Sequence, residues 1–394
     1  MALDLRNEKG IPLDRQGMSW REMAGLPISK LDCDAFTRVR VILMNGIEAG
    51  AIRNSHAIAR VRGDLRPALA ELRRAEQHQQ TAVNWLLGAD HSPLETTIGF
   101  EQVAIEVTAA VAKAEPDPYL AQVYRYGLLE DFDHLYRFAA LLDRVEGKDA
   151  NNILQSYTDI LPGRPTREEH RAPFDDLREP YDRTKAAPLS KIHAALITAA
   201  EQMTHDYYMT VGPQFADPIA RMLYAEIASI EEQHVTQYEC LADPDETVVE
   251  KWLVHECMEA YAYWCCMLRE SDPRVRAIWE RFLQWELGHL HYVAGLYRVH
   301  EHKDPFTVLP EQFSEAIAFE SHRAFVRQVL RDEVDLRALG TKFVPAAQVP
   351  ADGPSARYRA RLHTGGVASE VVAAGYRWEP GTELVRLAMA EGRV

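Results

Sequence analysis

Two short motifs in the second half of the chain place a carboxylate and an imidazole where they can act together. Glu231 is followed three residues later by His234, and Glu286 stands three residues before His289. Residues three apart lie on one face of an α-helix, so each pair can direct both groups at one point. Carboxylate oxygens and imidazole nitrogens bind iron and manganese. The two motifs therefore indicate metal binding.

Two further glutamates, Glu201 and Glu256, lie near the middle of predicted helices in the same half of the chain. Leu253 and Ala260 stand about one turn from Glu256, which predicts that this acid faces the protein core. Unpaired charges in a core are very costly, and two divalent ions would balance four carboxylates. We therefore expect one complete dinuclear site, formed by Glu201, Glu231, His234, Glu256, Glu286 and His289.

The first half of the chain repeats these landmarks at a nearly constant distance. Glu101 lies 155 residues before Glu256, and His78 lies 156 residues before His234. Low sequence identity makes each match weak, but several matches at one spacing predict an internal duplication. A repeat of this length is too long for a solenoid and fits two fused helical bundles.

The duplication predicts a second, weaker metal site in the first half. Ala75 stands at the 156-residue spacing from Glu231, so this copy lacks one carboxylate, and we expect it to bind between zero and two metal ions. A metal-free cluster of hydrogen-bonded acids and histidines is the alternative. The weaker candidate ligands are Glu48, His78, Glu101, Asp131 and His134.

Together these residues resemble the ligand set of the ferritin-like di-iron carboxylate superfamily, which includes ferritins, rubrerythrins, ribonucleotide reductase small subunits and bacterial multicomponent monooxygenases. The resemblance implies two Fe ions in the second bundle, with manganese or a mixed Mn/Fe pair as alternatives. It implies one ion on Glu201 and His234, the other on Glu256 and His289, and bridges from Glu231 and Glu286.

Two observations keep a structural interpretation open. A chain this rich in Glu and His is expected to contain about one Glu-x-x-His pair by chance, so the motifs carry weight only through their place in a four-helix set. Glu259, three residues after Glu256, resembles an extra carboxylate of rubrerythrins and is a further candidate ligand. A partly solvated helix acid is an equally good interpretation of Glu259.

Hydrophobic periodicity predicts an all-α protein, and the resemblance makes it two tandem ferritin-like four-helix bundles with a helical C-terminal extension. We expect an N-terminal segment at 1–34, a bundle with a degenerate metal site at 35–146, a linker at 147–186, a bundle with the complete site at 187–301, and the extension at 302–394. The linker is rich in proline and charge and should be irregular and solvated. The predicted helices span 35–62, 66–88, 95–114, 117–146, 187–212, 216–241, 246–270, 273–301 and 311–338.

Composition limits the classes of partner. The net charge of −15 disfavours nucleic acid and anionic membranes. The five cysteines include no Cys-x-x-Cys pair, which disfavours a sulfur-ligated metal site or a disulfide framework. No signal peptide or membrane-spanning run is visible, so we expect a cytoplasmic protein.

The function that these features favour is an oxidoreductase that activates O2 or H2O2 at a carboxylate and histidine metal site. No catalytic residue beyond the metal ligands can be named, and an oxygenase of this kind would need an external electron donor. The alternatives are a ferroxidase or peroxide-scavenging protein that handles iron, and a non-enzymatic scaffold in which metal only holds helices together. A homodimer fits any of the three.

Overall fold

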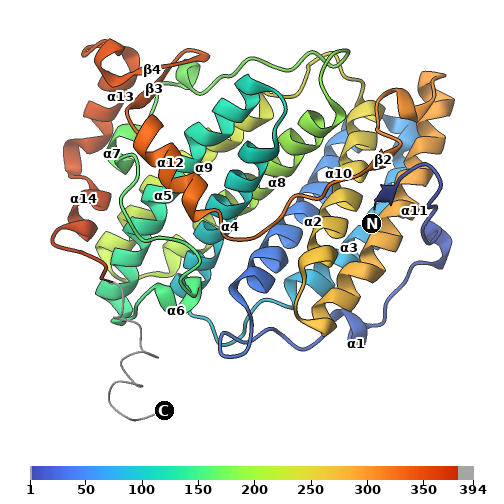
Figure 1. The fold of residues 1–394 in the computed structure, drawn as a ribbon, viewed down its shortest axis with the longest axis horizontal. Coiled ribbons are helices and arrows are strands. Elements are labelled where there is room, and N and C mark those ends of the chain that lie inside the picture. Colours follow the sequence, from blue (N-terminus) through green and yellow to red (C-terminus); the bar gives the residue numbers. More distant parts are fainter. Residues whose placement is uncertain (1, 380–394) are drawn as a thin grey trace.

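Eight long helices form the body of the protein in the computed structural model, which describes residues 2–379 (Figure 1). The all-α prediction is confirmed, since helices dominate these residues and the four strands are short. All eight predicted long helices are present, with ends within about four residues of the expected positions. The long helices are α2 (Ala35–Val61), α3 (Arg66–Asn84), α4 (Pro93–Ala114), α5 (Pro118–Glu146), α8 (Pro188–Val211), α9 (Pro218–Glu239), α10 (Val248–Arg269) and α11 (Pro273–Glu301).

Aspartate caps followed by proline fix where several of these helices begin. Asp117 Oδ1 accepts a hydrogen bond of 2.8 Å from the backbone N–H of Tyr119, and Asp272 Oδ1 accepts one of 2.8 Å from that of Arg274. The proline after each cap has its φ preset for a helix and lacks only an N–H that would have no partner in the first turn. Local sequence therefore explains these helix starts.

Neighbouring helices pack as four hairpins, α2/α3, α4/α5, α8/α9 and α10/α11. The hairpins then combine across the two halves of the chain. The α2/α3 hairpin packs with α10/α11, which we name bundle A, and the α4/α5 hairpin packs with α8/α9, which we name bundle B (Figure 1). Bundles A and B contact each other mainly through α2 and α8.

This grouping differs from the expected one, in which residues 35–146 and residues 187–301 each form a bundle. Every bundle in the structure takes one hairpin from each half of the chain. The reason is that the two halves carry the same apolar stripes, so a hairpin can bury its stripe against either copy of its partner. Periodicity shows which face is buried but not which hairpin covers it.

The segment 147–186 is irregular, as expected, but it is only partly solvated, because several of its charged side chains are buried. It contains only short helices, α6 (Asn151–Leu154), α7 (Thr166–Glu169) and the 3₁₀-helix η3 (Pro173–Asp175). Arg164, Glu169 and Arg171 are all at least 95% buried against bundle B. Their charges pair with buried partners on α5, which is why a strongly charged segment can lie inside the protein.

Both ends of the described chain cover the bundles. The N-terminal strand β1 (Leu3–Asp4) pairs antiparallel with β2 (Gln312–Phe313), and the N–H of Ile11 donates to the carbonyl of Gln284 on α11 at 2.7 Å. The short helix α1 (Trp20–Met23) follows. The N-terminal segment therefore lies along α11 in bundle A. This position brings the side chain of Gln16 to the buried His289 of α11.

The C-terminal extension begins beside bundle A, where Phe313 packs on Tyr261 of α10, and its later part covers bundle B, where α14 contacts α5 and α9. The helix expected over 311–338 is shorter, because strand residues occupy both of its ends. The remaining extension elements are α12 (Arg323–Glu333), a hairpin of β3 (Leu336–Leu339) and β4 (Lys342–Pro345), α13 (Pro354–Leu362) and α14 (Ala368–Ala373). Residues 380–394 of the predicted extension lie outside the described residues.

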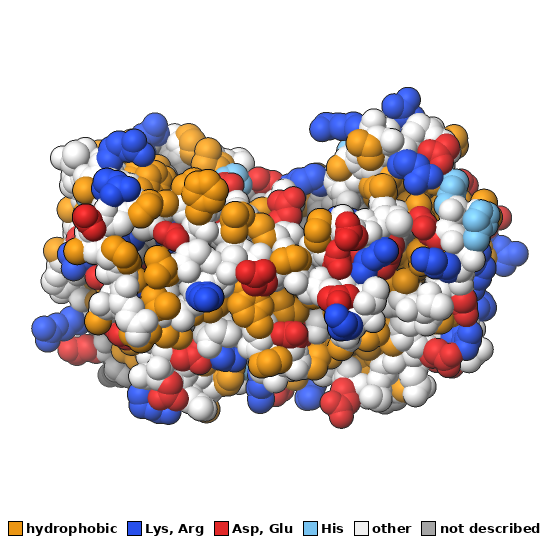
Figure 2. All heavy atoms as spheres, turned by 90° about the horizontal axis from the view of Figure 1, so that it is seen from above, with side chains coloured by type: hydrophobic (Ala, Val, Ile, Leu, Met, Phe, Trp, Pro, Cys, Tyr) orange, Lys and Arg blue, Asp and Glu red, His pale blue; other side chains and the backbone are white. Residues whose placement is uncertain are grey.

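The remaining elements are single 3₁₀ turns that join longer ones. They are η1 (Leu13–Arg15), η2 (Gly63–Leu65), η4 (Gly212–Gln214), η5 (Pro305–Thr307), η6 (Ala346–Gln348) and η7 (His363–Gly365). Seen from above, the outline dips between two raised ends, and charged side chains of both signs spread over this face (Figure 2). Among residues 2–379, no helix has both the length and the apolar character that crossing a bilayer requires.

Candidate metal centres

Bundle B encloses a cluster of four carboxylates and two imidazoles, which we name cluster B. Every member is at least 98% buried. The ligand atoms form two overlapping groups in which all atoms lie within 4.8 Å of one another, and Glu231 belongs to both groups. The members are Glu101 on α4, Asp131 and His134 on α5, Glu201 on α8, and Glu231 and His234 on α9.

Both histidines of cluster B direct their Nδ1 atom toward Glu231. His134 Nδ1 lies 3.1 Å from Glu231 Oε1, and His234 Nδ1 lies 3.2 Å from Glu231 Oε2. The outer nitrogens are also held, with His134 Nε2 at 2.8 Å from Glu169 and His234 Nε2 at 2.8 Å from Glu130. Metal-binding histidines are oriented in this way, with one nitrogen facing the ion and the other held by a carboxylate.

Two arginines from the irregular segment balance the charge of Glu130. Arg164 Nη1 lies 3.0 Å from Glu130 Oε1, and Arg171 Nη1 lies 2.6 Å from the same oxygen. Burial alone would raise the pKa of Glu130, but Arg171, His234 and Arg164 together hold it well below its ordinary value. Glu130 is therefore an anion that can fix the orientation of His234.

Bundle A encloses a second cluster, which we name cluster A, with five carboxylates and one imidazole. All six side chains are at least 98% buried. Their ligand atoms also form two overlapping groups, which share Glu76 and Glu286. Glu256 and His289 complete one group, and Glu48 and Glu259 complete the other. Cluster A therefore consists of two ligand groups that have two carboxylates in common.

His289 in cluster A is held like the histidines of cluster B. Its Nδ1 atom lies 3.0 Å from Glu76 Oε1 and 3.1 Å from Glu286 Oε2. Its Nε2 atom lies 2.6 Å from the side-chain oxygen of Gln16 in the N-terminal segment. The amide group of Gln16 donates to the carbonyls of Ile11 and Trp285, which fixes the side chain so that its oxygen faces His289.

The six residues expected to form one complete site are divided between the two clusters. Glu201, Glu231 and His234 lie in cluster B, whereas the other half of the expected set lies in cluster A. The expectation of a single site from these residues is wrong because α8/α9 and α10/α11 belong to different bundles. Each cluster is instead completed by residues of the first half. The residues of the expected single site that lie in cluster A are Glu256, Glu286 and His289, and the further candidate Glu259 lies there too.

The weaker candidates of the first half are also divided. Glu101, Asp131 and His134 complete cluster B, and Glu48 lies in cluster A. His78 belongs to neither cluster among the described residues, and its side chain lies at the partly exposed side of α3.

Glu76 and Gln79 occupy the positions assigned to Ala75 and His78. They precede Glu231 and His234 by 155 residues, the spacing that relates the later landmarks, so keeping that spacing through α3 would have identified them. Glu76 supplies the carboxylate that Ala75 lacks. Gln79 stands where cluster B has a histidine, and its amide group donates to Glu286.

Other functional residues had no sequence signal. Glu130 adjoins the ligand Asp131 in sequence but is buried between His234 Nε2 and Arg171, while Glu169 and Gln16 lie in irregular segments. Irregular segments have no period, so their buried positions cannot be read from hydrophobic spacing.

Burial and mutual repulsion give the carboxylates unusual proton affinities. In cluster A, burial and the neighbouring acids raise the pKa of Glu48, Glu256 and Glu259 well above the ordinary value. In cluster B, burial and Asp131 raise the pKa of Glu201 to about 8. Burial opposes ionisation of Glu231 as well, but the charges and hydrogen bonds of the two histidines outweigh it and bring its pKa to about 2. In both clusters the carboxylates outnumber the imidazoles, so negative charge remains in excess even where the histidines are protonated.

Several buried carboxylate oxygens in the clusters have no hydrogen-bond partner. Both oxygens of Glu259 are of this kind, as is one oxygen each of Glu48, Glu101 and Glu256. Unsatisfied buried acids are costly and rare, and they call for an ion or a proton. The donor set of oxygens and histidine nitrogens fits iron or manganese, so the residues present fit a pair of divalent ions in each cluster.

Aromatic side chains donate hydrogen bonds to three of the cluster carboxylates. Tyr208 donates to Glu101 at 2.5 Å, Tyr263 donates to Glu48, and Trp252 Nε1 donates to Glu256 at 2.7 Å. These hydrogen bonds fix the carboxylates before any ion binds. They also place an oxidisable tyrosine directly beside each cluster.

A cavity of about 320 Å³ lies where α2, α8, α9 and α10 meet. Tyr238 and His255 are among its lining residues. The Tyr238 ring lies 6.2 Å from the His234 ring of cluster B, and His255 Nε2 lies 3.8 Å from Glu259 of cluster A. The walls of this one cavity therefore reach the neighbours of both clusters.

Comparison with known proteins adds no further constraint. No family model, no curated protein and no solved structure matches this chain. The functional argument consequently depends on the geometry of the two clusters.

Proposed function

We propose that the protein binds two pairs of transition-metal ions, one pair in each cluster, and uses them as an oxidoreductase that reacts with O2 or H2O2. The observation that carries the proposal is that each cluster consists of two ligand groups joined by shared carboxylates. Cluster A shares Glu76 and Glu286, and cluster B shares Glu231. Shared carboxylates between two groups are the arrangement of the ferritin-like dinuclear centres.

Iron is the metal that we favour, with manganese or a mixed Mn/Fe pair as alternatives, since oxygen and nitrogen ligands suit both metals. A reduced pair of such ions can pass electrons to O2 or peroxide. The described residues carry five cysteines as free thiols and no metal-ligating cysteine group, so electrons would come from an external donor or from the substrate.

The protein's own residues have three tasks in this proposal. Glu130 and Glu169 hold the outer nitrogens of the histidines in cluster B, and Gln16 does so in cluster A. The apolar packing of the bundles keeps water from the ligands. Tyr208 and Tyr263, hydrogen-bonded to Glu101 and Glu48, can carry an electron between a cluster and its surroundings.

The cavity beside Tyr238 and His255 is the place that we propose for an organic substrate. Its volume of about 320 Å³ is within the range of small-molecule sites. Arg53, Lys191 and Lys251 line it together with Glu239 and Glu246, so both charge signs are available to a polar substrate.

The test is to load the metal-free protein anaerobically with Fe(II) and then add O2 or H2O2. We expect a rapid change in the optical spectrum, with the oxidised iron remaining bound to the chain. The Glu231→Ala variant should lose the part of this change that arises from cluster B. Oxidised iron that leaves the chain would favour the iron-handling alternative. Bound Fe(II) that neither oxidant changes would overturn the proposal and favour a metal-stabilised scaffold.

A further inference from the structure

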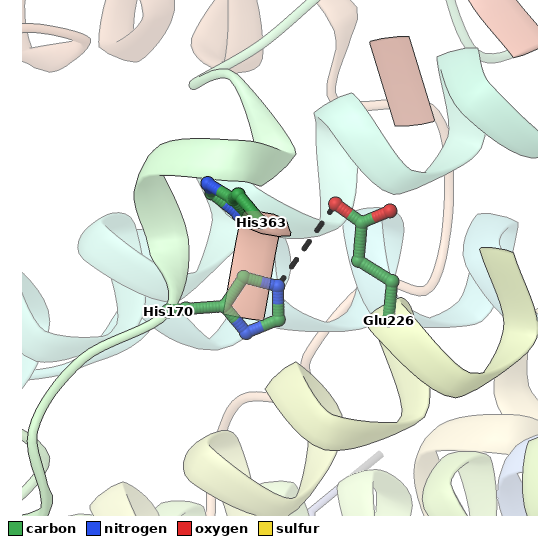
Figure 3. A group of neighbouring side chains, drawn as sticks. All are labelled: His170, Glu226 and His363. Atoms are coloured by element: carbon green, nitrogen blue, oxygen red, sulfur yellow. Dashed lines mark ion pairs between the residues drawn. The ribbon is translucent and has the colours of Figure 1, made fainter. Parts of the chain in front are cut away.

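A third group of possible ligands lies outside clusters A and B, on the side of bundle B that the C-terminal extension covers. His170 comes from the irregular segment, Glu226 from α9 and His363 from η7 (Figure 3). One ligand atom from each lies within 4.8 Å of the other two. Figure 3 shows one edge of the His170 ring turned toward the Glu226 carboxylate, with His363 beside them.

The histidines of this group lack the partners that buried imidazoles normally have. His170 is 98% buried, but its Nδ1 atom has no hydrogen-bond partner, and its Nε2 atom lies 3.9 Å from Glu226 Oε1, beyond hydrogen-bond distance. The Nε2 atom of His363 is also buried without a partner. His170 Nε2 and Glu226 Oε1 are thus too far apart for a hydrogen bond but close enough to share an ion, and the buried Nε2 atom of His363 has no partner to compete with that ion.

Glu226, in contrast, is fixed in place. Its Oε1 atom accepts a hydrogen bond of 2.8 Å from Ser369 Oγ, and its Oε2 atom accepts one of 2.9 Å from the Ser369 N–H. These bonds keep one lone pair on each oxygen available. The carboxylate is therefore held in position for the histidines without being neutralised by a cation.

A cavity of about 290 Å³ opens beside the group and is lined by all three residues. Met222, Leu362 and Val367 supply an apolar part of the wall, and backbone of the 365–366 turn supplies another part. An ion held by three side chains would therefore keep coordination positions that water or a small ligand could reach from the cavity.

We propose that His170, Glu226 and His363 form a third, mononuclear site for a divalent transition metal. Two imidazoles and one carboxylate are the protein ligands of both open zinc sites and mononuclear Fe(II) sites. Each ligand comes from a different part of the chain, so the ion joins the irregular segment, α9 and the C-terminal extension. A bound ion therefore also holds residues 354–373 against bundle B.

Two ligands of the third site are close in sequence to residues of cluster B or its partners. His170 follows Glu169, which holds His134, and Glu226 stands five residues before Glu231 on α9. Even so, no ligand is shared among the described residues. Occupancy of the third site can therefore be measured separately from that of the clusters.

The test uses the full-length, metal-free protein and Zn²⁺ in equilibrium dialysis. We expect His363→Gln and Glu226→Gln each to bind one Zn²⁺ fewer per chain than the wild type. The matched control is His56→Gln, because His56 is exposed on α2 and should not change the count. Unchanged Zn²⁺ binding in His363→Gln, with the same count as His56→Gln, would overturn the proposal.

Amide hydrogen exchange provides a second test that does not depend on the number of Zn²⁺ ions bound per chain. Zn²⁺ should slow amide hydrogen exchange in residues 354–373 of the wild type but not of His363→Gln. Equal exchange with and without Zn²⁺ in the wild type would overturn the inference that an ion holds this region. The clusters can be checked independently, since Glu231→Ala should retain the protection of residues 354–373 even if cluster B binds nothing.

Discussion

At the scale of single residues, the two clusters differ in charge. Cluster B has four carboxylates and two imidazoles, whereas cluster A has five carboxylates and one imidazole. The difference arises because Gln79 stands in α3 where α9 carries His234, and Glu259 supplies a carboxylate instead. An additional buried negative charge binds a divalent ion more tightly and stabilises a higher oxidation state. We therefore expect the ions of cluster A to be the harder pair to remove.

Glu259 should determine how many ions cluster A holds. In Glu259→Gln, one ligand group retains only Glu48 and the two shared carboxylates, with no imidazole. We expect this variant to bind one ion fewer per chain than the wild type when titrated with Mn²⁺ or Fe²⁺. Glu280→Gln, an exposed change on α11, is the control. A full metal count in Glu259→Gln would mean that Glu259 is only a buried, protonated acid.

Glu169 should tune the affinity of cluster B without binding metal itself. It holds His134 Nε2 at 2.8 Å, and loss of such a partner typically weakens metal binding about 10–100-fold. Glu169→Gln should therefore raise the dissociation constant of cluster B by about this factor and leave cluster A unchanged. The neighbouring Glu168→Gln should change neither, because Glu168 is half-buried outside the clusters and pairs with Arg337. Equal affinity in Glu169→Gln and Glu168→Gln would contradict this role.

At the scale of elements, the sequence predicts a segment well only where its apolar residues recur with the period of a helix. The long helices follow from their apolar stripes and from caps such as Asp117 and Asp272. The ligands on these helices follow from residue type and from the 155-residue spacing between the two halves. The exception is α3, where the alignment is one residue out of register and selects Ala75 instead of Glu76. Segment 147–186 and the residues around Gln16 have no period, so their buried contacts to the clusters could not be predicted.

Helix α4 is joined to two irregular segments through Glu106, and this contact should make stability depend on pH. Glu106 accepts hydrogen bonds from Thr158 Oγ1 at 2.6 Å and from the His322 N–H at 2.7 Å. Burial raises its pKa from 4.5 to about 7. Between these values the folded chain binds more protons than the unfolded chain, so the free energy of unfolding should fall as pH rises from about 4.5 to 7.

Replacing Glu106 by Gln removes this titration. In the metal-free protein, denaturant unfolding at pH 5 and pH 7 should show a loss of stability that is smaller in Glu106→Gln than in the wild type, by roughly 2–3 kcal/mol. The exposed change Glu280→Gln should leave the wild-type pH dependence intact. A pH dependence that is the same in Glu106→Gln and in the wild type would show that Glu106 keeps an ordinary pKa.

At the scale of the whole molecule, the two halves of the chain depend on each other. Each bundle takes one hairpin from each half, and each cluster is completed only by ligands from both. The internal duplication could be predicted from the spacing of Glu101 and Glu256. The exchange of hairpins could not, because the stripes of both halves are equivalent and the long connection at 147–186 reaches either arrangement.

The fragment 187–301 distinguishes the two arrangements. It contains the whole ligand set that was expected to form a single site, yet in the structure it provides only half of each bundle. As a monomer, it should therefore be poorly folded by circular dichroism and bind no ion pair, whereas the full chain should be folded and should bind ion pairs under the same conditions. A monomeric, cooperatively folded fragment that binds two ions would mean that the hairpins of one half can complete a site without the other half.

The most direct test of the central claim is to compare the metal content of Glu231→Ala, Glu76→Ala and the double variant with that of the wild type, by elemental analysis after anaerobic loading with Fe(II). Glu231 and Glu76 are shared carboxylates of different clusters. The account predicts that each single variant loses about two ions per chain and that the double variant loses about four, while Glu232→Ala, its exposed neighbour on α9, loses none. Full metal content in either single variant would contradict two separate dinuclear centres. So would a double variant that loses no more ions per chain than a single variant does.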